Sequence, residues 1–363
     1  MKHSIIDTIA DLNRSLAHDF RVTPLYAPDA PIFMAVAWPT CDRVTGLKPR
    51  LPAGRGTTLA QAMRSAGAEA IELRASLAQN HLSVMGDLPQ RQGRAMVPGQ
   101  NLLTGETALV PAQQVFLDFA RISGEPLDHD ADSTGCATGP GLADASLSAL
   151  LECLERDAVA LWWHGGLQAG ALSLDLIDAM QPRLFWWLQE RPRQTLLLDL
   201  STDTGVAVVA AVSAEPDGHG VATGTAARLN HADAALAAVT EMLQTEAAMT
   251  QAAAVRDPDY LLWLGHACTR TMPQFQTRHL MTPVIHPAVS RALATDLTGI
   301  LHRLRDLGHP TLRVDLTLPG DPAPTVRVLV PGLCAMQGRI AMARFSRLTG
   351  HKVPPDPHAI EPF

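Results

Sequence analysis

The chain has few charged and few aromatic residues, and its charges form no basic run. Charged residues make up 18% of the 363 positions, aromatic residues make up 4%, and the formal net charge is −7. A surface for the phosphate backbone of a nucleic acid needs clustered lysine and arginine. We therefore expect no nucleic-acid partner. The apolar fraction of 47% is spread along the chain, which is typical of a folded globular protein.

Long apolar runs are also missing. No stretch reaches the ~18 residues that a membrane helix needs. The N-terminal segment carries Asp7 and Asp11 where a signal peptide would be apolar. The sequence therefore predicts a cytoplasmic protein without a membrane span.

Cysteine and histidine occur without the spacings that disulfide frameworks and zinc sites use. The five cysteines are odd in number and widely scattered, and they include no CxxC pair. The fourteen histidines include no HxxxH or HExxH pair, and His266 with Cys268 lacks further ligands nearby. Neither a disulfide framework nor a histidine metal site is predicted.

Helical and strand patterns mix along the chain without the regular alternation of a doubly wound sheet, which predicts an α+β fold. We expect one domain over residues 1–363, with subregions at about 1–130 and 131–340 and a proline-containing tail at 341–363. The predicted helices cover residues 3–18, 59–77, 143–163 and 232–254. The predicted strands cover residues 32–38, 115–117, 195–200, 205–212, 313–317 and 325–330, of which the last two are expected to pair.

Two of the predicted helices carry a serine and two glutamates at one shared spacing, S-x-x-x-E-x-x-E. In the first helix Ser65, Glu69 and Glu72 fall within about 40° of one another, so they form one polar stripe. The second helix repeats the spacing at residues 148, 152 and 155. A single helix of this kind is typical of a solvated surface, because glutamate is a common surface helix former. The repetition favours a functional role.

Each of these helices also follows a glycine-rich loop, at residues 54–56 and 132–141. Glycine lets backbone N–H groups approach a phosphate closely. Carboxylates can hold Mg²⁺ against nucleotide phosphates. Because the chain has no GxxxxGK[ST] motif and no kinase HRD or DFG motif, the pattern predicts a nucleotide site of another kind.

Four blocks of sequence, in this order, resemble the YcaO family. They are GRGTTLAQAMRSAGAEAIE, STGCATGPGLADASLSALLECLERDA, ALAAVTEMLQ and LRVDLTLPGDPAPTVRVLVPGL, within residues 54–333. The resemblance implies an α+β fold with mixed sheets, in which pseudo-repeated units of glycine loop and helix surround a central nucleotide site. It also implies ATP and Mg²⁺ as cofactors.

Carried over by position, the resemblance assigns a role to each motif residue. The metal ligands would be Glu69, Glu72, Glu152 and Glu155, and the catalytic residues would be Glu155 and Arg156. The nucleotide contacts would be Ser133, Asp144, Arg156, Glu241 and Gln244. The chain departs from the family pattern at Leu73, at residues 138–140 and at Glu246.

The implied reaction is phosphorylation of a peptide amide oxygen by ATP. The segment at residues 105–117 resembles the version in cyclodehydratases, so we expect azolines to form from Cys, Ser or Thr of a ribosomally made precursor peptide. One alternative is thioamide formation with a TfuA-type partner, because residues 353–363 lack a PxPxP pattern. Another is a catalytically silent nucleotide-binding subunit, consistent with Leu73 and the altered loop. The expected partners are a separate leader-peptide-binding (E1-like) or TfuA-like protein and a second copy of the chain in a homodimer.

Overall fold

The chain folds into two compact units in a computed structural model. The model describes residues 14–25, 30–46, 50–129, 131–255, 257–277, 293–334 and 341–352. The first unit comprises residues 1–26, 33–150 and 310–331, and the second comprises residues 27–32, 151–309 and 332–363. The helix predicted at residues 3–18 lies largely outside the described residues. Residues 353–363 of the predicted tail lie wholly outside them.

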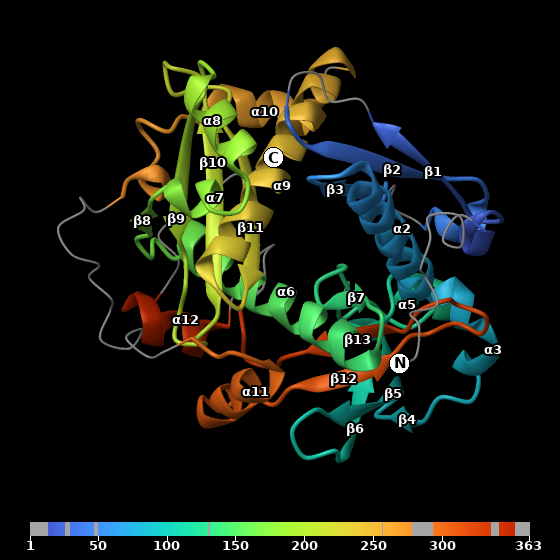
Figure 1. Cartoon of the computed structure of the whole chain (residues 1–363). Helices are drawn as coiled ribbons and strands as arrows, with labels where there is room; N and C mark the ends of the chain where they lie inside the picture. The colour runs from blue at the N-terminus through green and yellow to red at the C-terminus, as the bar shows by residue number, and fades with distance from the viewer. Residues whose placement is uncertain are drawn as a thin grey trace. The chain divides into compact units, whose positions relative to one another are not determined.

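The first unit contains a three-stranded antiparallel sheet covered by one long helix. The strands are β1 (Phe20–Leu25), β2 (Phe33–Pro39) and β3 (Ala53–Gly56), and the helix is α2 (Leu59–Ser76) (Figure 1). The side chains and backbone of Thr58 and Gln61 form a capping box, which starts α2 where the sequence predicts it. A Cβ on Gly54 would lie 2.1 Å from the backbone nitrogen of Ala66. Glycine therefore lets α2 pack directly on β3.

A second sheet of the first unit joins segments that lie far apart in the sequence. Its order is β4-β5-β12-β13-β7, with β6 paired to β5. The predicted pairing of the last two strings is confirmed by β12 and β13, which run antiparallel. The strand predicted at residues 115–117 is wrong, because α4 occupies residues up to Val115 and the buried run that follows packs in the core. The elements are β4 (Gln90–Arg91), β5 (Arg94–Asn101), β6 (Thr107–Pro111), β7 (Cys136–Thr138), β12 (Leu312–Asp315), β13 (Thr325–Leu329), α3 (Leu82–Met85), α4 (Ala112–Val115) and α5 (Phe119–Ser123).

The second unit is built on a four-stranded antiparallel sheet with the order β11-β10-β9-β8. The strands are β8 (Gly170–Leu172), β9 (Gln194–Asp199), β10 (Ala207–Ala214) and β11 (Ala222–Arg228), and the helix α9 (His231–Val255) packs on β10 and β11 (Figure 1). The sequence predicts β9, β10 and α9. It misses β11, whose residues are mostly small because α9 lies against it. A Cβ on Gly224 would come within 2.2 Å of the backbone nitrogen of Met242.

Helices complete the second unit, and the mixture of helices and antiparallel sheets confirms the predicted α+β class. The predicted helix at residues 143–163 is confirmed by α6 (Leu142–Trp163), of which residues 142–150 belong to the first unit and residues 151–163 to the second. The part of the chain with assigned structure contains no helix long and apolar enough to cross a membrane. The other helices are α7 (Asp175–Asp178), α8 (Pro182–Glu190), α10 (Pro258–His266), α11 (Leu297–Asp306) and α12 (Met342–Thr349).

His231, in the first turn of α9, forms a titratable pair with Asp199 of β9 that is expected to make stability depend on pH. His231 Nε2 lies 3.4 Å from Asp199 Oδ2, and Ser201 Oγ donates to Asp199 Oδ1 at 2.5 Å. The hydrogen bond with Asp199 raises the pKa of His231. Although burial alone would raise the pKa of Asp199, its bonds with His231 and Ser201 lower it below the usual range.

Because the pKa of His231 is higher in the folded protein, its contribution to stability is complete below its unfolded pKa of about 6.5 and is lost as the pH rises through the folded value. The contribution of Asp199 is present above its unfolded pKa of about 3.9 and is lost at lower pH. Between about pH 6 and about pH 8.5, we expect the free energy of unfolding to fall more in the wild type than in His231→Gln. Urea titrations at both pH values measure this difference. Equal falls in the two proteins would contradict it.

Candidate functional site

In the first unit, the two glutamates of the polar stripe of α2 accept hydrogen bonds from neighbouring backbone, one from β3 and one from the second glycine-rich loop. Ser65 and Glu69 are exposed, and Glu72 is half-buried. The Oε2 atom of Glu69 accepts a hydrogen bond from the backbone nitrogen of Ala53 at 3.2 Å. The Oε1 atom of Glu72 accepts one from the backbone nitrogen of Thr138 at 2.9 Å. Glu72 therefore links α2 to the second glycine-rich loop.

That loop, at residues 132–141, is held from beneath by a buried arginine. Arg327 on β13 donates to the backbone oxygen of Asp132 at 2.6 Å, and its side chain is only 4% exposed. Asp132 Oδ1 in turn accepts from the backbone nitrogen of Thr134 at 2.9 Å. A Cβ on Gly139 would lie 2.6 Å from the backbone nitrogen of Ala145, so the loop packs tightly on the start of α6. These contacts fix the course of the loop backbone.

Two predicted nucleotide contacts of the first unit are exposed and lie close to this loop. Ser133 is in the loop itself, and Asp144 is in the first turn of α6. A carboxylate in the first turn of a helix is stabilised by the positive end of the helix dipole. The amide groups of this turn are also the kind that bind anions.

In the second unit, the E-x-x-E-R motif of α6 lies against β11. Glu155 is buried, and its carboxylate accepts from Thr225 Oγ1 at 2.7 Å and from the backbone nitrogen of Ala227 at 3.1 Å. The guanidinium of Arg156 lies 3.8 Å from Glu152 Oε1 and 3.8 Å from Glu155 Oε1. The side chain of Arg156 is 34% exposed and that of Glu152 is 27% exposed. One turn of helix thus presents two carboxylates and a cation.

Glu155 is an unusual carboxylate because it is buried among charges of both signs. Burial raises its pKa, Arg156 opposes the rise, and the carboxylate of Glu241 on α9 adds to it. Protonation is therefore easier here than for an exposed glutamate until a cation is near. A divalent cation would reverse this preference. The carboxylates around Glu155 therefore suit a bound cation better than they suit a bound anion.

The other α9 positions divide into two kinds. Glu241 and Gln244 are half-buried, and the effect of Glu241 on the pKa of Glu155 brings α9 into the same electrostatic environment as α6. Glu246, a departure from the family pattern, accepts from Arg191 Nη1 at 2.9 Å and from Ser213 Oγ at 2.5 Å. Glu246 is therefore a structural ion-pair residue. Leu73, another departure, is a buried core residue of the first unit.

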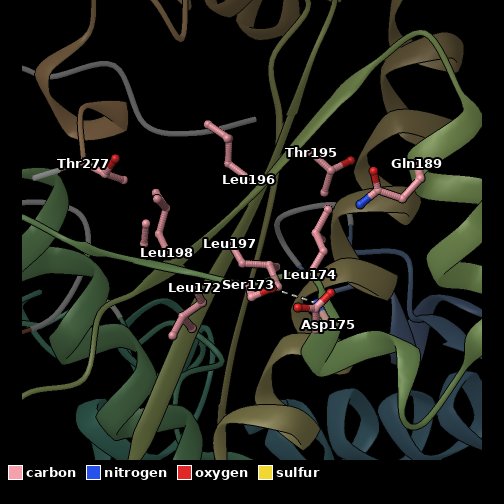
Figure 2. Close-up of a pocket in the computed structure, with 11 residues that line it drawn as sticks. Leu172, Ser173, Leu174, Asp175, Gln189, Thr195, Leu196, Leu197, Leu198 and Thr277 are labelled. Carbon is pink, nitrogen blue, oxygen red and sulfur yellow. Dashed lines mark hydrogen bonds between the residues drawn. The ribbon is translucent and has the colours of Figure 1, made fainter. Parts of the chain in front are cut away.

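A pocket in the second unit contains none of these residues. It has a volume of about 270 Å³ and lies beside β8 and β9, with leucines on the strands and with Asp175 and Gln189 on its helical side (Figure 2). Its lining includes no arginine, lysine or histidine. The predicted nucleotide contacts therefore do not line this pocket.

The structure thus gathers the predicted residues in two groups, each within one unit. Glu72 meets the glycine-rich loop in the first unit, and Glu152, Glu155, Arg156 and Glu241 share one environment in the second. Among the described residues, no three histidine, cysteine or acidic side chains are grouped as a metal site. Sequence reasoning missed Thr225 and Arg327. Arg327 lies within the apolar string TVRVL, and a charged residue in such a string could have indicated a functional or structural role. No pattern in the sequence singles out Thr225.

A family model described as YcaO cyclodehydratase, ATP- and Mg²⁺-binding, matches residues 84–334. A protein of Rhizobium leguminosarum bv. trifolii, named "Uncharacterized protein in tfuA 3'region", is 28% identical over 339 residues, covering 77% of this chain and 76% of its own.

Solved structures also share the fold. A heterocyclase in complex with substrate and cofactor has a TM-score of 0.75 at 20% identity, with 98% of this chain and 57% of that chain covered. YcaO from Methanopyrus kandleri, bound with AMPPCP and Mg²⁺, has a TM-score of 0.65 at 21% identity, with 91% of each chain covered. The chain therefore spans just over half the length of the heterocyclase that it matches.

Proposed function

This chain belongs to the YcaO family, and from that premise we propose that it uses ATP and Mg²⁺ to activate backbone amides of a peptide. In the proposed reaction a nucleophile adds to the amide carbon, the amide oxygen takes the γ-phosphoryl group of ATP, and phosphate then leaves. The best-supported product is an azoline made from Cys, Ser or Thr. The description of the matching family as a cyclodehydratase supports this choice.

The observation that carries the proposal is the cluster of Glu152, Glu155 and Arg156 in the middle of α6. Mg²⁺ in nucleotide sites is usually held by one or two carboxylates together with phosphate oxygens and water. Glu152 and Glu155 can supply such carboxylates, and the raised pKa of Glu155, caused first by burial, is what an incoming cation would offset. To Arg156, which lies beside both of them, we assign the role of neutralising charge on the transferring phosphoryl group.

We assign the remaining contacts by residue type. Glu69 and Glu72 on α2 are the second pair of proposed metal ligands. Ser133 and Asp144 lie close to loop amides and to a helix N-terminus, which are groups that bind phosphate. Glu241 and Gln244 of α9 are the remaining proposed nucleotide contacts.

Thioamide formation is the second candidate, and one observation favours it. The Rhizobium relative takes its name from its place in the 3' region of tfuA, and the relation spans most of both chains. Azoline formation needs only a side-chain nucleophile of the substrate, whereas thioamide formation needs external sulfide and, on this proposal, a TfuA-like partner. A homodimer and a separate peptide-recognition protein belong to both versions.

The test is reconstitution with a Cys/Ser/Thr-rich precursor peptide. The chain is incubated with Mg·ATP, the peptide and either an E1-like or a TfuA-like partner with sulfide, and phosphate release and peptide mass are measured. Loss of one water per modified residue supports azolines, and exchange of one oxygen for sulfur supports thioamides. ATP binding without turnover in either mixture would instead support a silent nucleotide-binding subunit.

A further inference from the structure

The residue that follows the E-x-x-E-R motif is a fully buried aspartate. At 100° per residue, Asp157 lies about 160° around α6 from Glu155, on the opposite side of the same turn. Its Oδ1 atom accepts from Arg344 Nε at 2.7 Å and from the backbone nitrogen of Cys334 at 2.8 Å. Its Oδ2 atom accepts from Arg344 Nη2 at 2.6 Å. Asp157 therefore binds α6 to α12, the last helix that the structure describes.

Arg344 also contacts a second buried carboxylate. Its Nη2 atom donates to Asp203 Oδ1 at 2.9 Å, and Arg347 Nη2 lies 3.1 Å from Asp203 Oδ2. The side chains of Asp157, Arg344 and Asp203 are 0%, 1% and 6% exposed. One buried network thus joins α6, α12 and the loop between β9 and β10, all within the second unit.

Apolar packing continues the same contact toward the end of α6. Phe345 of α12 is fully buried against Ala160, Leu161 and Cys334. Gly165, just after α6, leaves room for the ring, because a Cβ there would lie 3.0 Å from Phe345 Cε2. The contact between α12 and α6 therefore begins directly after Arg156 and extends to Leu161.

An ion pair of this kind is better suited to fixing geometry than to adding stability. Replacing a buried pair by apolar side chains of similar volume is often neutral or stabilising, because desolvation offsets the attraction between the charges. A bidentate arginine–carboxylate contact, however, holds both partners in one orientation. Because an α-helix turns as a rigid unit, a fixed orientation of Asp157 also fixes the directions in which Glu152, Glu155 and Arg156 point.

We propose that Asp157 is a positioning residue. In this proposal, which rests on the proposed function, the docking of α12 on Asp157 sets the affinity of the α6 motif for Mg·ATP. The network holds the turn of α6 in the rotation that presents Glu152 and Arg156, and release of α12 lets that turn relax. Helix α12 thereby becomes a device that controls nucleotide binding from the opposite side of α6.

Two variants of the full chain separate this role from simple stability. Asp157→Asn removes the charge of the aspartate, and Arg344→Lys keeps its charge but loses the bidentate contact. We expect both to weaken Mg·ATP binding, measured by isothermal titration, by about 10-fold to 100-fold, as supporting residues around metal ligands do. The control is Val212→Ala, which creates a cavity at a fully buried position of β10 and changes no residue of the Asp157–Arg344 network.

Cys334 reports the docking of α12 independently of ATP. Burial raises the pKa of this thiol to about 12. We expect Arg344→Lys, which leaves every carboxylate in place, to speed alkylation of Cys334 at least about 10-fold, because undocking restores the ordinary reactivity of an exposed thiol. The half-buried Cys41 serves as the reference in the same peptide map.

The outcomes are distinct. The positioning role is supported if both network variants bind Mg·ATP more weakly while Val212→Ala binds it within about twofold of the wild-type affinity. This comparison requires that Val212→Ala lose a similar amount of melting temperature to the network variants. Wild-type affinity in a variant whose Cys334 alkylates rapidly overturns it, and so does a loss of affinity that simply follows melting temperature in all three variants. Failure of the wild type itself to bind Mg·ATP would overturn the proposed function instead.

Discussion

Replacing Glu152 by glutamine is expected to abolish ATP turnover while leaving the fold intact. The substitution keeps the shape of the side chain but removes the negative charge that we assign to a metal ligand beside Arg156. Loss of such an electrostatic contact reduces turnover by at least about 100-fold, or ~2.7 kcal/mol of transition-state stabilisation. Glu152 is half-buried and packs in no core cluster that the structure describes. The melting temperature of the Glu152→Gln variant should therefore differ from that of the wild type by less than about 2 °C. Phosphate release and thermal unfolding are the measurements.

Two other glutamates supply the comparison for turnover and stability. Glu190→Gln, at the exposed end of α8, should retain wild-type turnover. Glu155→Gln should lose turnover and stability together, because the carboxylate of Glu155 accepts hydrogen bonds from both Thr225 and the backbone of Ala227. A large loss of melting temperature in Glu152→Gln would instead make Glu152 a structural carboxylate. Unchanged turnover would remove it from the proposed site.

Substitution of Gly224 by alanine is expected to destabilise the second unit strongly. The added Cβ would meet the backbone of α9, 2.2 Å from Met242 N and 2.4 Å from Ala238 O, and no side-chain rotation relieves such a clash. Moving α9 away from β11 should cost about 3 kcal/mol or more, since overpacking costs 1–3 kcal/mol even where side chains can yield. This lowers the melting temperature by roughly 6 to 12 °C. Differential scanning calorimetry measures it.

Gly265→Ala is the matched control, because Gly265 lies in α10 with no atom within 4 Å of the added Cβ. Alanine is the better helix former, so this variant should be unchanged or more stable by up to about 1 kcal/mol. Gly224→Ala should also weaken Mg·ATP binding, because β11 carries the hydrogen bonds to Glu155. A melting temperature of Gly224→Ala equal to that of Gly265→Ala would contradict the close packing of α9 on β11.

The long helices and some of the long strands, such as β9 and β10, could be predicted from the sequence because their signals are local. Thr58 and Gln61 cap α2 three residues apart, and α9 is rich in alanine over its whole length. The failures have tertiary causes. The strand β11 reads ATGTAAR, without the bulky residues of a typical strand, because α9 packs directly on it. The apolar run at residues 115–117 looks like a strand, but Val115 ends the short helix α4 and Phe116 is buried in the core.

The candidate site was predictable only in part for the same reason. The spacing of the glutamates on α6 identifies the polar stripe, but periodicity does not show that Glu155 is buried against Thr225, some seventy residues later. The partner of Asp157 is still farther along the chain, at Arg344. Such pairs arise from the sheet and helix packing of the second unit, and no local pattern encodes them. The roles of the site residues as ligands of Mg·ATP remain predictions that binding experiments test.

Titration of the wild-type chain with ATP, in the presence and absence of Mg²⁺, tests the central claim most directly. We predict saturable binding at one site per chain that requires Mg²⁺ and is lost in Glu152→Gln, whose thermal unfolding stays close to that of the wild type. A folded wild-type chain that shows no Mg²⁺-dependent binding of ATP would contradict the proposed function.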